Sequence, residues 1–235
     1  MDLANLQPPV FHRLMVKEGV ANFLRHAILS GKLNPGDLIV EMKWAKQLKV
    51  SQSSVREAIS RLESDGFVEP LANRRTCVTL FTPERVRHTF RIRASLESLA
   101  VELCAQQKQP HWLDSLQRAA DEMAAAAMGG DVQRFFDRDL VFHQRLWEYS
   151  GNPLLPRLLR QLVIPLFGFV IMKVNPSPVV TEDLVKRAAT HQQIVNLIRQ
   201  EDPAAAAEFM RRTIDGFCER ILGLLEKQAA VPAGE

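Results

Sequence analysis

The stretch "LKVSQSSVREAISRLESDGFVEP", residues 48–70, decides the fold of the first part of the chain. Val55, Ile59 and Leu62 recur at the spacing of one helix face, which predicts an amphipathic helix that packs on a small core. Serines and Gln52 gather at its start, where several of them could serve as the N-cap. The segments on either side decide whether this polar helix start is a solvated face or a surface that touches a partner.

Two helical segments precede this stretch. Residues 16–33 carry apolar side chains at helical spacing and end near a glycine, and "NPGD" (34–37) is a turn by composition. Residues 42–50 read as a second, short helix. Only Val50 and Ser51 connect it to the helix of the opening stretch, so the two helices are joined by a tight turn.

Two short β-prone segments follow. Gly66 ends the helix, and the pieces 67–69 and 77–81 flank a polar, basic tip at 73–75. Helix, short helix, tight turn, helix and hairpin form the order of a winged helix-turn-helix. In that unit the second helix of the turn enters the DNA major groove with its N-terminal residues at the base edges.

The basic residues favour the same interpretation. The net charge of +3 resides in the first eighty residues, which hold eleven basic and eight acidic residues. The alternative without DNA contact is that Arg56 pairs with Glu63 or Ser60 on a solvated helix face. The order of elements favours DNA contact instead, because an arginine fork suits guanine and lysines suit phosphates. The candidate DNA-binding residues are Lys46, Lys49, Ser51, Gln52, Ser53, Arg56, Arg61, Arg74 and Arg75.

The segments "AILSGKLNPGD" and "VSQSSVREAISRLESDGFVEP" resemble the DNA-binding domain of GntR-type bacterial transcription regulators, particularly their FadR-like branch. The resemblance covers about residues 10–80 and implies a homodimer on a short palindromic operator. Gln52 stands where this family usually has arginine, and Arg75 stands where its wing usually has glycine. The operator sequence and the wing geometry are therefore expected to depart from those of relatives.

The chain after Pro83 is helical throughout by pattern. Breaks at prolines and glycines divide it into short-linked helices, which predicts an all-α antiparallel bundle. We expect a mainly α protein with two domains, residues 1–82 for DNA binding and residues 83–235 for effector binding and dimerisation. The expected helices of the bundle are 83–108, 110–128, 131–150, 153–174, 180–200 and 203–228.

Asp139 and His143 lie one helical turn apart, so both side chains can bind one cation. By itself such a pair is more often a simple hydrogen bond. The segment 84–228 resembles the helical effector-binding domain called FCD, in which an Asp and three histidines bind a divalent metal such as Zn, Ni or Mn. The resemblance carries over to Asp139, His143 and His191, while Thr213 stands in place of the last histidine and is a poor ligand. Two alternatives remain open: a metal site with three protein ligands and open coordination positions, or a ligand site that has lost its metal.

Arg93 and Glu97 match an Arg-x-x-x-Glu pattern of the same domain. The resemblance places such an arginine in the cavity, where its fork would bind the carboxylate of a small organic acid. The alternative is an ordinary surface ion pair between Arg93 and Glu97, and Arg91 is a nearby competitor. The expected effector site contains Arg93, Asp139, His143, His191 and Thr213.

Two other functional classes are compatible with parts of the sequence, an enzyme and a dimerisation module. Two histidines and one carboxylate could form a non-haem iron enzyme site, but the chain has no nucleophile elbow, P-loop or HExxH motif. The bundle could also be a plain dimerisation module without a ligand. Three cysteines without CxxC spacing and no apolar leader in residues 1–15 favour a soluble protein of the reducing cytoplasm, without a membrane partner. The sequence thus predicts a cytoplasmic transcription regulator that is not an enzyme.

Overall fold

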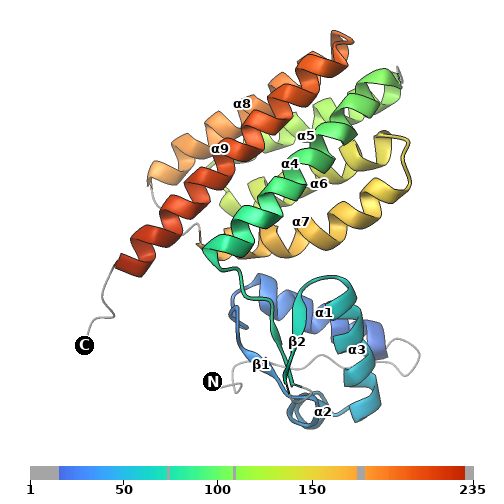
Figure 1. The fold of residues 1–235 in the computed structure, drawn as a ribbon, viewed down its shortest axis with the longest axis vertical. Coiled ribbons are helices and arrows are strands. Elements are labelled where there is room, and N and C mark those ends of the chain that lie inside the picture. The colour runs from blue at the N-terminus through green and yellow to red at the C-terminus, as the bar shows by residue number, and fades with distance from the viewer. Residues whose placement is uncertain (1–15, 73–74, 108–109, 174–177, 231–235) are drawn as a thin grey trace. The chain divides into compact units, whose positions relative to one another are not determined.

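The computed structural model describes residues 16–72, 75–107, 110–173 and 178–230. The chain divides into two compact units, Met1–Leu80 and Phe81–Glu235. Within the described residues the first unit contains three helices and a small sheet, and the second contains six helices (Figure 1). Among these helices none combines the length and apolar composition needed to cross a membrane.

The first unit is a three-helix core with a sheet at its edge. Its helices are α1 (Val16–Leu29), α2 (Glu41–Leu48) and α3 (Gln52–Ser64). Trp44 of α2 is buried and meets Phe23 of α1 edge-on, with ring centroids 6.2 Å apart. The apolar face of α3 is buried, as its spacing predicts: Val55, Ala58, Ile59 and Leu62.

The turn between α2 and α3 depends on one unusual backbone conformation. Lys49 has φ 53° and ψ 43°, a left-handed conformation that ends α2 and sends the chain directly into α3. Gly66, with φ 77°, plays the same part after α3 without the strain that a side chain brings. The two helices therefore meet as a helix-turn-helix.

The sheet has three short antiparallel strands in the order β1-β3-β2. These are β1 (Leu38–Ile39), β2 (Val68–Leu71) and β3 (Arg75–Val78). Val68 pairs with Val78 and Leu71 with Arg75, which builds the hairpin of the wing. The sequence prediction of two strands at 67–69 and 77–81 found the hairpin, but each predicted strand overlaps the observed one by only two residues, and Arg75, predicted in the tip, begins β3. The prediction missed β1, whose two residues are too few to show an alternating pattern.

The second unit is the expected all-α bundle. The sequence-predicted helix boundaries are right to within two residues, because polar residues just before several helices accept hydrogen bonds from the first turn. Thr82 accepts from the Arg85 amide at 3.2 Å, and Asp131 accepts from the Arg134 amide at 3.0 Å. The helices are α4 (Pro83–Gln106), α5 (Pro110–Met128), α6 (Val132–Tyr149), α7 (Leu154–Lys173), α8 (Pro178–Arg199) and α9 (Pro203–Ala230).

These helices surround one continuous core. α4 packs along α9, and α5 lies between α6 and α8 (Figure 1). Large side chains such as Phe90, Phe136, Phe142 and Trp147 are fully buried in it. A smaller set of buried side chains is polar or charged, and most of these face one another from α4, α6 and α8: Arg93, Glu97, Asp139, His143, Arg187 and His191.

Candidate functional site

The start of α3 is a polar surface organised by Ser51. Its hydroxyl oxygen accepts from the Ser54 amide at 3.1 Å, so Ser51 is the N-cap among the three serines that the sequence offers. The same oxygen lies 2.9 Å from the Ser53 hydroxyl. Ser51, Gln52 and Ser53 are all exposed. The first turn of α3 therefore presents hydroxyl and amide groups to a partner.

Arg56 pairs with Glu41 and not with Glu63 or Ser60, the partners expected if it had no part in DNA contact. Its Nη2 donates to Glu41 Oε2 at 2.8 Å, and its Nε lies 3.1 Å from both Glu41 oxygens. Gln52 Nε2 donates to the same Glu41 Oε2 at 2.9 Å. The hydrogen bond to Arg56 holds the pKa of Glu41 below its ordinary value, and the same bond raises the pKa of Arg56. One carboxylate of α2 thus holds two of the predicted DNA-binding side chains.

The other predicted DNA-binding residues within the described part of the chain lie in three places. Lys46 is exposed on α2, and Lys49 is exposed at the C-cap of the same helix, where the turn to α3 begins. Arg61 lies further along α3 and makes an ion pair with Glu18 of α1 at 3.4 Å. Arg75 is exposed at the first position of β3, while Arg74 lies outside the described residues.

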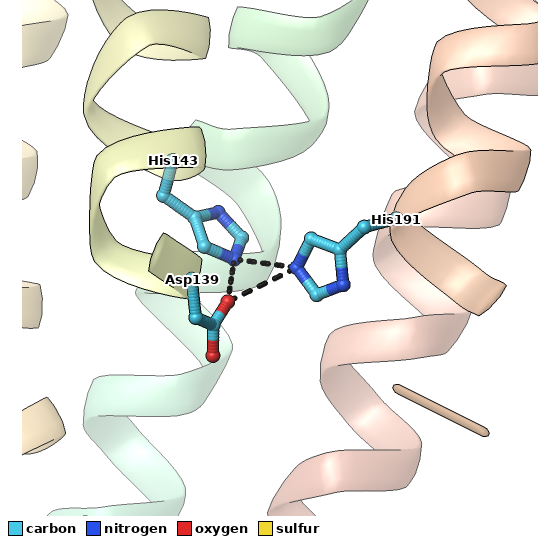
Figure 2. A group of neighbouring side chains, drawn as sticks. All are labelled: Asp139, His143 and His191. Carbon is cyan, nitrogen blue, oxygen red and sulfur yellow. Dashed lines mark hydrogen bonds and ion pairs between the residues drawn. The ribbon is translucent and has the colours of Figure 1, made fainter. Parts of the chain in front are cut away.

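The buried site of the second unit is built on a triangle of potential metal ligands (Figure 2). Asp139 Oδ1 lies 3.3 Å from His143 Nε2 and 3.0 Å from His191 Nε2. The two imidazole Nε2 atoms are 3.4 Å apart. Asp139 and His143 come from neighbouring turns of α6, and His191 reaches them from α8. The structure brings together the three residues that the resemblance singled out.

Neighbouring groups fix the orientation of both imidazoles. His191 Nδ1 lies 2.8 Å from the Arg187 carbonyl oxygen, which can only accept a hydrogen bond, so Nδ1 is the donor and Nε2 carries the lone pair when this imidazole is neutral. His143 Nδ1 lies 2.8 Å from Glu97 Oε2, a contact off the line of a straight hydrogen bond. Arg93 Nη2 lies 3.3 Å from His143 Nε2 and can only donate to it. When both imidazoles are neutral and carry their proton on Nδ1, the two Nε2 atoms are acceptors that face the centre of the triangle.

This donor set fits a divalent metal. Asp139 Oδ1 is buried and has no aligned hydrogen bond among the described residues, although two imidazoles lie beside it. In that protonation state three acceptor atoms converge without a proton between them, and a cation at their centre would relieve their mutual repulsion. Bond lengths at zinc separate neighbouring ligand atoms of a tetrahedral site by about 3.3 Å. Asp139, His143 and His191 match that separation, and Glu97 and the Arg187 carbonyl supply the outer contacts that such histidines usually make.

Two buried arginines complete the site. Arg93 Nε donates to Glu97 Oε1 at 3.2 Å, and the two side chains are only 4% and 0% exposed. The interpretation of this pair as an ordinary surface ion pair is therefore wrong; Arg91 is the exposed arginine of this helix. Arg187 donates to Asp139 Oδ2 at 2.8 Å, and its guanidinium lies 4.3 Å from the centre of the Phe217 ring.

Sequence reasoning missed Arg187. The available signal was its position four residues before His191, which puts both on one face of α8. Because His191 faces the buried polar site, a charged residue on the same face of α8 can reach that site too. An arginine on this face needs an acid opposite it, and Asp139 is that acid.

The pKa directions follow from this arrangement of charges. Burial alone would raise the pKa of Glu97, but the Arg93 and His143 charges outweigh burial and hold that pKa at about 2. Burial would also raise the pKa of Asp139, but without a metal the two imidazoles can carry a proton on Nε2, and their contacts with Asp139 together with Arg187 then hold that pKa well below its ordinary value. Both carboxylates are thus ionised at neutral pH and balance the two arginines.

A small cavity adjoins the triangle. Its volume is about 30 Å³, which is room for one or two waters. Thr213, half-buried on α9, lines it, and Arg93 lines it as well. All five expected effector-site residues therefore border one cavity. Its further walls are Arg187, Thr190, Ile194, Met210, Ile214, Phe217 and Arg220.

A winged helix-turn-helix joined to an all-α unit with a buried polar cavity is the architecture of two-unit DNA-binding regulators. Residues 16–78 match the bacterial regulatory proteins of the gntR family, and residues 88–216 match the FCD domain. The chain belongs to the GntR family of transcription regulators and carries an FCD domain. The family identified from the sequence is thereby confirmed, and the protein is a regulator rather than an enzyme.

Relatives of known name agree with this assignment. The chain is 28% identical over 207 residues to the HTH-type transcriptional regulator YdhC of Bacillus subtilis, covering 88% of this chain and 91% of that one. It is also 28% identical to a probable D-xylose utilization operon repressor of Paenarthrobacter nicotinovorans, covering 87% and 88%. The solved structure of McbR/YncC of E. coli has the same fold, with a TM-score of 0.69 at 23% identity over 91% of this chain and 98% of that one.

Proposed function

We propose that this regulator binds a palindromic operator as a homodimer in the cytoplasm and that a small carboxylate metabolite controls its operator affinity. The metabolite binds in the cavity of the second unit beside a divalent metal held by Asp139, His143 and His191. Arg93 binds the carboxylate of the metabolite through its guanidinium fork. Effector binding favours one of two arrangements of the dimer and thereby changes its affinity for DNA.

The observation that carries the metal is the convergence of three acceptor atoms. Asp139 Oδ1 and the Nε2 atoms of His143 and His191 lie within 3.4 Å of one another in a buried place. A bound divalent ion would supply positive charge and open coordination positions to an incoming carboxylate oxygen. Thr213 lines the same cavity and is a poor ligand, so an effector atom can take the place of a fourth protein ligand.

The charge of the buried groups favours an anionic effector. Arg93 and Arg187 are balanced by Glu97 and Asp139, so the protein groups alone are neutral when both histidines are neutral. A divalent ion then leaves two uncompensated positive charges in a buried place, which is costly without an anion. The cavity volume of about 30 Å³ is small for an organic acid, so side chains that line it must move when one enters.

The DNA side of the proposal rests on the exposed start of α3 and the hairpin. Gln52, Ser53 and Arg56 meet base edges or phosphates, and Lys46 and Lys49 meet the phosphate backbone. Ser51, Arg61, Arg74 and Arg75 complete the proposed contact set. The homodimer is supported by Ile92 and Leu99, apolar residues two turns apart on α4 that are 51% and 39% exposed.

Metal content after dialysis tests the metal. The wild type is expected to retain Zn, Ni or Mn in a stoichiometric amount when one of these is supplied, and His143→Ala is expected to lose it. His88→Ala is the matched control, because His88 is an exposed histidine of α4. Thr213→His is expected to add a fourth ligand and tighten binding. Absence of bound metal in the wild type and in Thr213→His would overturn the metal part of the proposal.

A thermal-shift screen of small organic acids tests the effector. Acids that bind only the native state raise the melting temperature by mass action. Arg93→Lys keeps the charge but removes the two-pronged donor, so it is expected to reduce those shifts. Arg91→Lys, a change at an exposed arginine of the same helix, is expected to leave them intact. Shifts produced by uncharged compounds alone, or by no compound, would contradict a carboxylate effector.

A further inference from the structure

A single carboxylate on α2 holds the two side chains best placed to meet base edges. Glu41 Oε2 accepts from Gln52 Nε2 at 2.9 Å and from Arg56 Nη2 at 2.8 Å. Gln52 and Arg56 lie four residues apart and so share one face of α3. Side chains at that spacing reach neighbouring base pairs when the helix start lies in the major groove.

The way in which Glu41 holds Arg56 leaves the end of the guanidinium open to a partner. The carboxylate engages Nε and Nη2, which are on one side of the planar group. A guanidinium has five N–H donors in fixed directions. The remaining donors on Nη1 and Nη2 form the end-on fork, which is the pair that matches guanine O6 and N7.

Glu41 also decides the orientation of the Gln52 amide. A carboxylate only accepts, so the nitrogen of the amide must be the atom that faces it. One Nε2 hydrogen is used at Glu41, and the second hydrogen and the Oε1 acceptor remain for a partner. A donor and an acceptor side by side complement adenine, which presents N7 as acceptor and N6 as donor in the major groove.

We propose that Glu41 is a positioning residue that sets the base preference of this regulator, with Arg56 reading guanine and Gln52 reading adenine on neighbouring base pairs. The proposal rests on the placement of α3 in the major groove. Gln52 is exposed in the first turn of α3, and its amide is oriented by Glu41, so an adenine preference follows from the orientation of this side chain.

The exposure of the cluster supports a role in recognition over one in folding. The side chains of Arg56 and Glu41 are 64% and 29% exposed, and exposed ion pairs contribute little to folding stability. Their hydrogen bonds nevertheless restrict two flexible side chains before DNA arrives. Such preorganisation reduces the side-chain entropy that is lost on binding.

Selection from a library of randomised double-stranded DNA tests the proposal, because such a library contains every short operator sequence. The full-length wild type is expected to enrich half-sites that contain a guanine and an adenine at neighbouring positions. Gln52→Arg is expected to replace the adenine preference by guanine and leave the other positions unchanged. Glu41→Gln is expected to relax the preference at both positions, with discrimination reduced about fivefold or more at each.

Glu63→Gln is the matched control for Glu41→Gln, because Glu63 is an exposed carboxylate near the end of α3. It is expected to enrich the wild-type half-site, and circular dichroism and thermal unfolding should show all variants folded. Two outcomes would overturn the proposal that Gln52 reads adenine. One is that the wild type selects guanine at the operator position assigned to Gln52, and the other is that Gln52→Arg keeps the adenine preference. Wild-type preferences retained at both positions in Glu41→Gln would overturn the positioning role. Failure of the wild type to enrich any sequence would instead overturn the operator-binding proposal on which this inference rests.

Discussion

The two units use charged side chains in opposite ways. In the first unit Glu41 and Arg56 meet at the surface, where water solvates both and a new partner can displace or extend their contacts. In the second unit Arg93, Glu97 and Asp139 are almost completely buried and each depends on a named counter-charge. The exposed cluster can be altered with little risk to the fold, whereas the buried one carries stability and binding together. Function and stability are therefore separable in one unit and coupled in the other.

The largest effect is expected from Glu97→Ala. This change leaves the Arg93 guanidinium buried without its counter-charge, which costs about 3–5 kcal/mol of unfolding free energy. Chemical denaturation of the full chain measures it, with Glu41→Ala as the exposed counterpart that should change the stability very little. A Glu97→Ala protein as stable as Glu41→Ala would break the contrast between the two units.

A smaller effect, on binding rather than on folding, is expected from Arg56→Ala. Loss of one fork contact to guanine should weaken operator binding by roughly five- to 150-fold and relax the preference at that base. Titrations on the selected operator and on a duplex with the guanine replaced would measure both quantities. Unchanged affinity for both duplexes would remove Arg56 from the base-reading set, and an altered melting temperature would mean that the exposed cluster also supports the fold.

The smallest effect is expected from Lys46→Ala. An exposed lysine on a phosphate should contribute equally to all DNA sequences, so its loss should weaken binding evenly. The slope of log affinity against log salt should fall in magnitude by about 1. Salt titrations on specific and unrelated duplexes test this sharper division of the surface into base-reading and phosphate-binding residues. A loss confined to the operator would place Lys46 among the base readers.

Much of this architecture could be predicted from the chain because local signals agree with it. The Ser51, Thr82 and Asp131 caps and the apolar spacing of α3 fix helix starts and faces within a few residues of themselves. Strand β1 was not predicted, because two residues are too few to show the alternation of apolar and polar side chains that indicates a strand. The family and the Asp139–His143–His191 set came from resemblance, since spacing alone does not tell a metal site from a hydrogen bond.

The partners of the functional residues were harder to foresee than the residues themselves. Glu41 lies 15 residues before Arg56, and Arg187 lies 48 residues after Asp139. Neither separation corresponds to a helix or strand repeat, so only the folded chain brings the pairs together. Arg93 was assigned to the effector site from the resemblance, but whether it is buried or exposed depends on how α4 packs among the other helices.

The long sequence separations within the buried site have a kinetic consequence. Arg93 meets His143 across 50 residues, and Arg187 meets Asp139 across 48. Contacts that close such long loops form late, after shorter-range structure has repaid part of the entropy. The cavity therefore comes into existence only when the bundle is nearly complete, and a ligand that binds there lowers the free energy of the native state without helping the folding transition state. Such a ligand slows unfolding and leaves the folding rate almost unchanged, so an occupied regulator persists longer once it has folded.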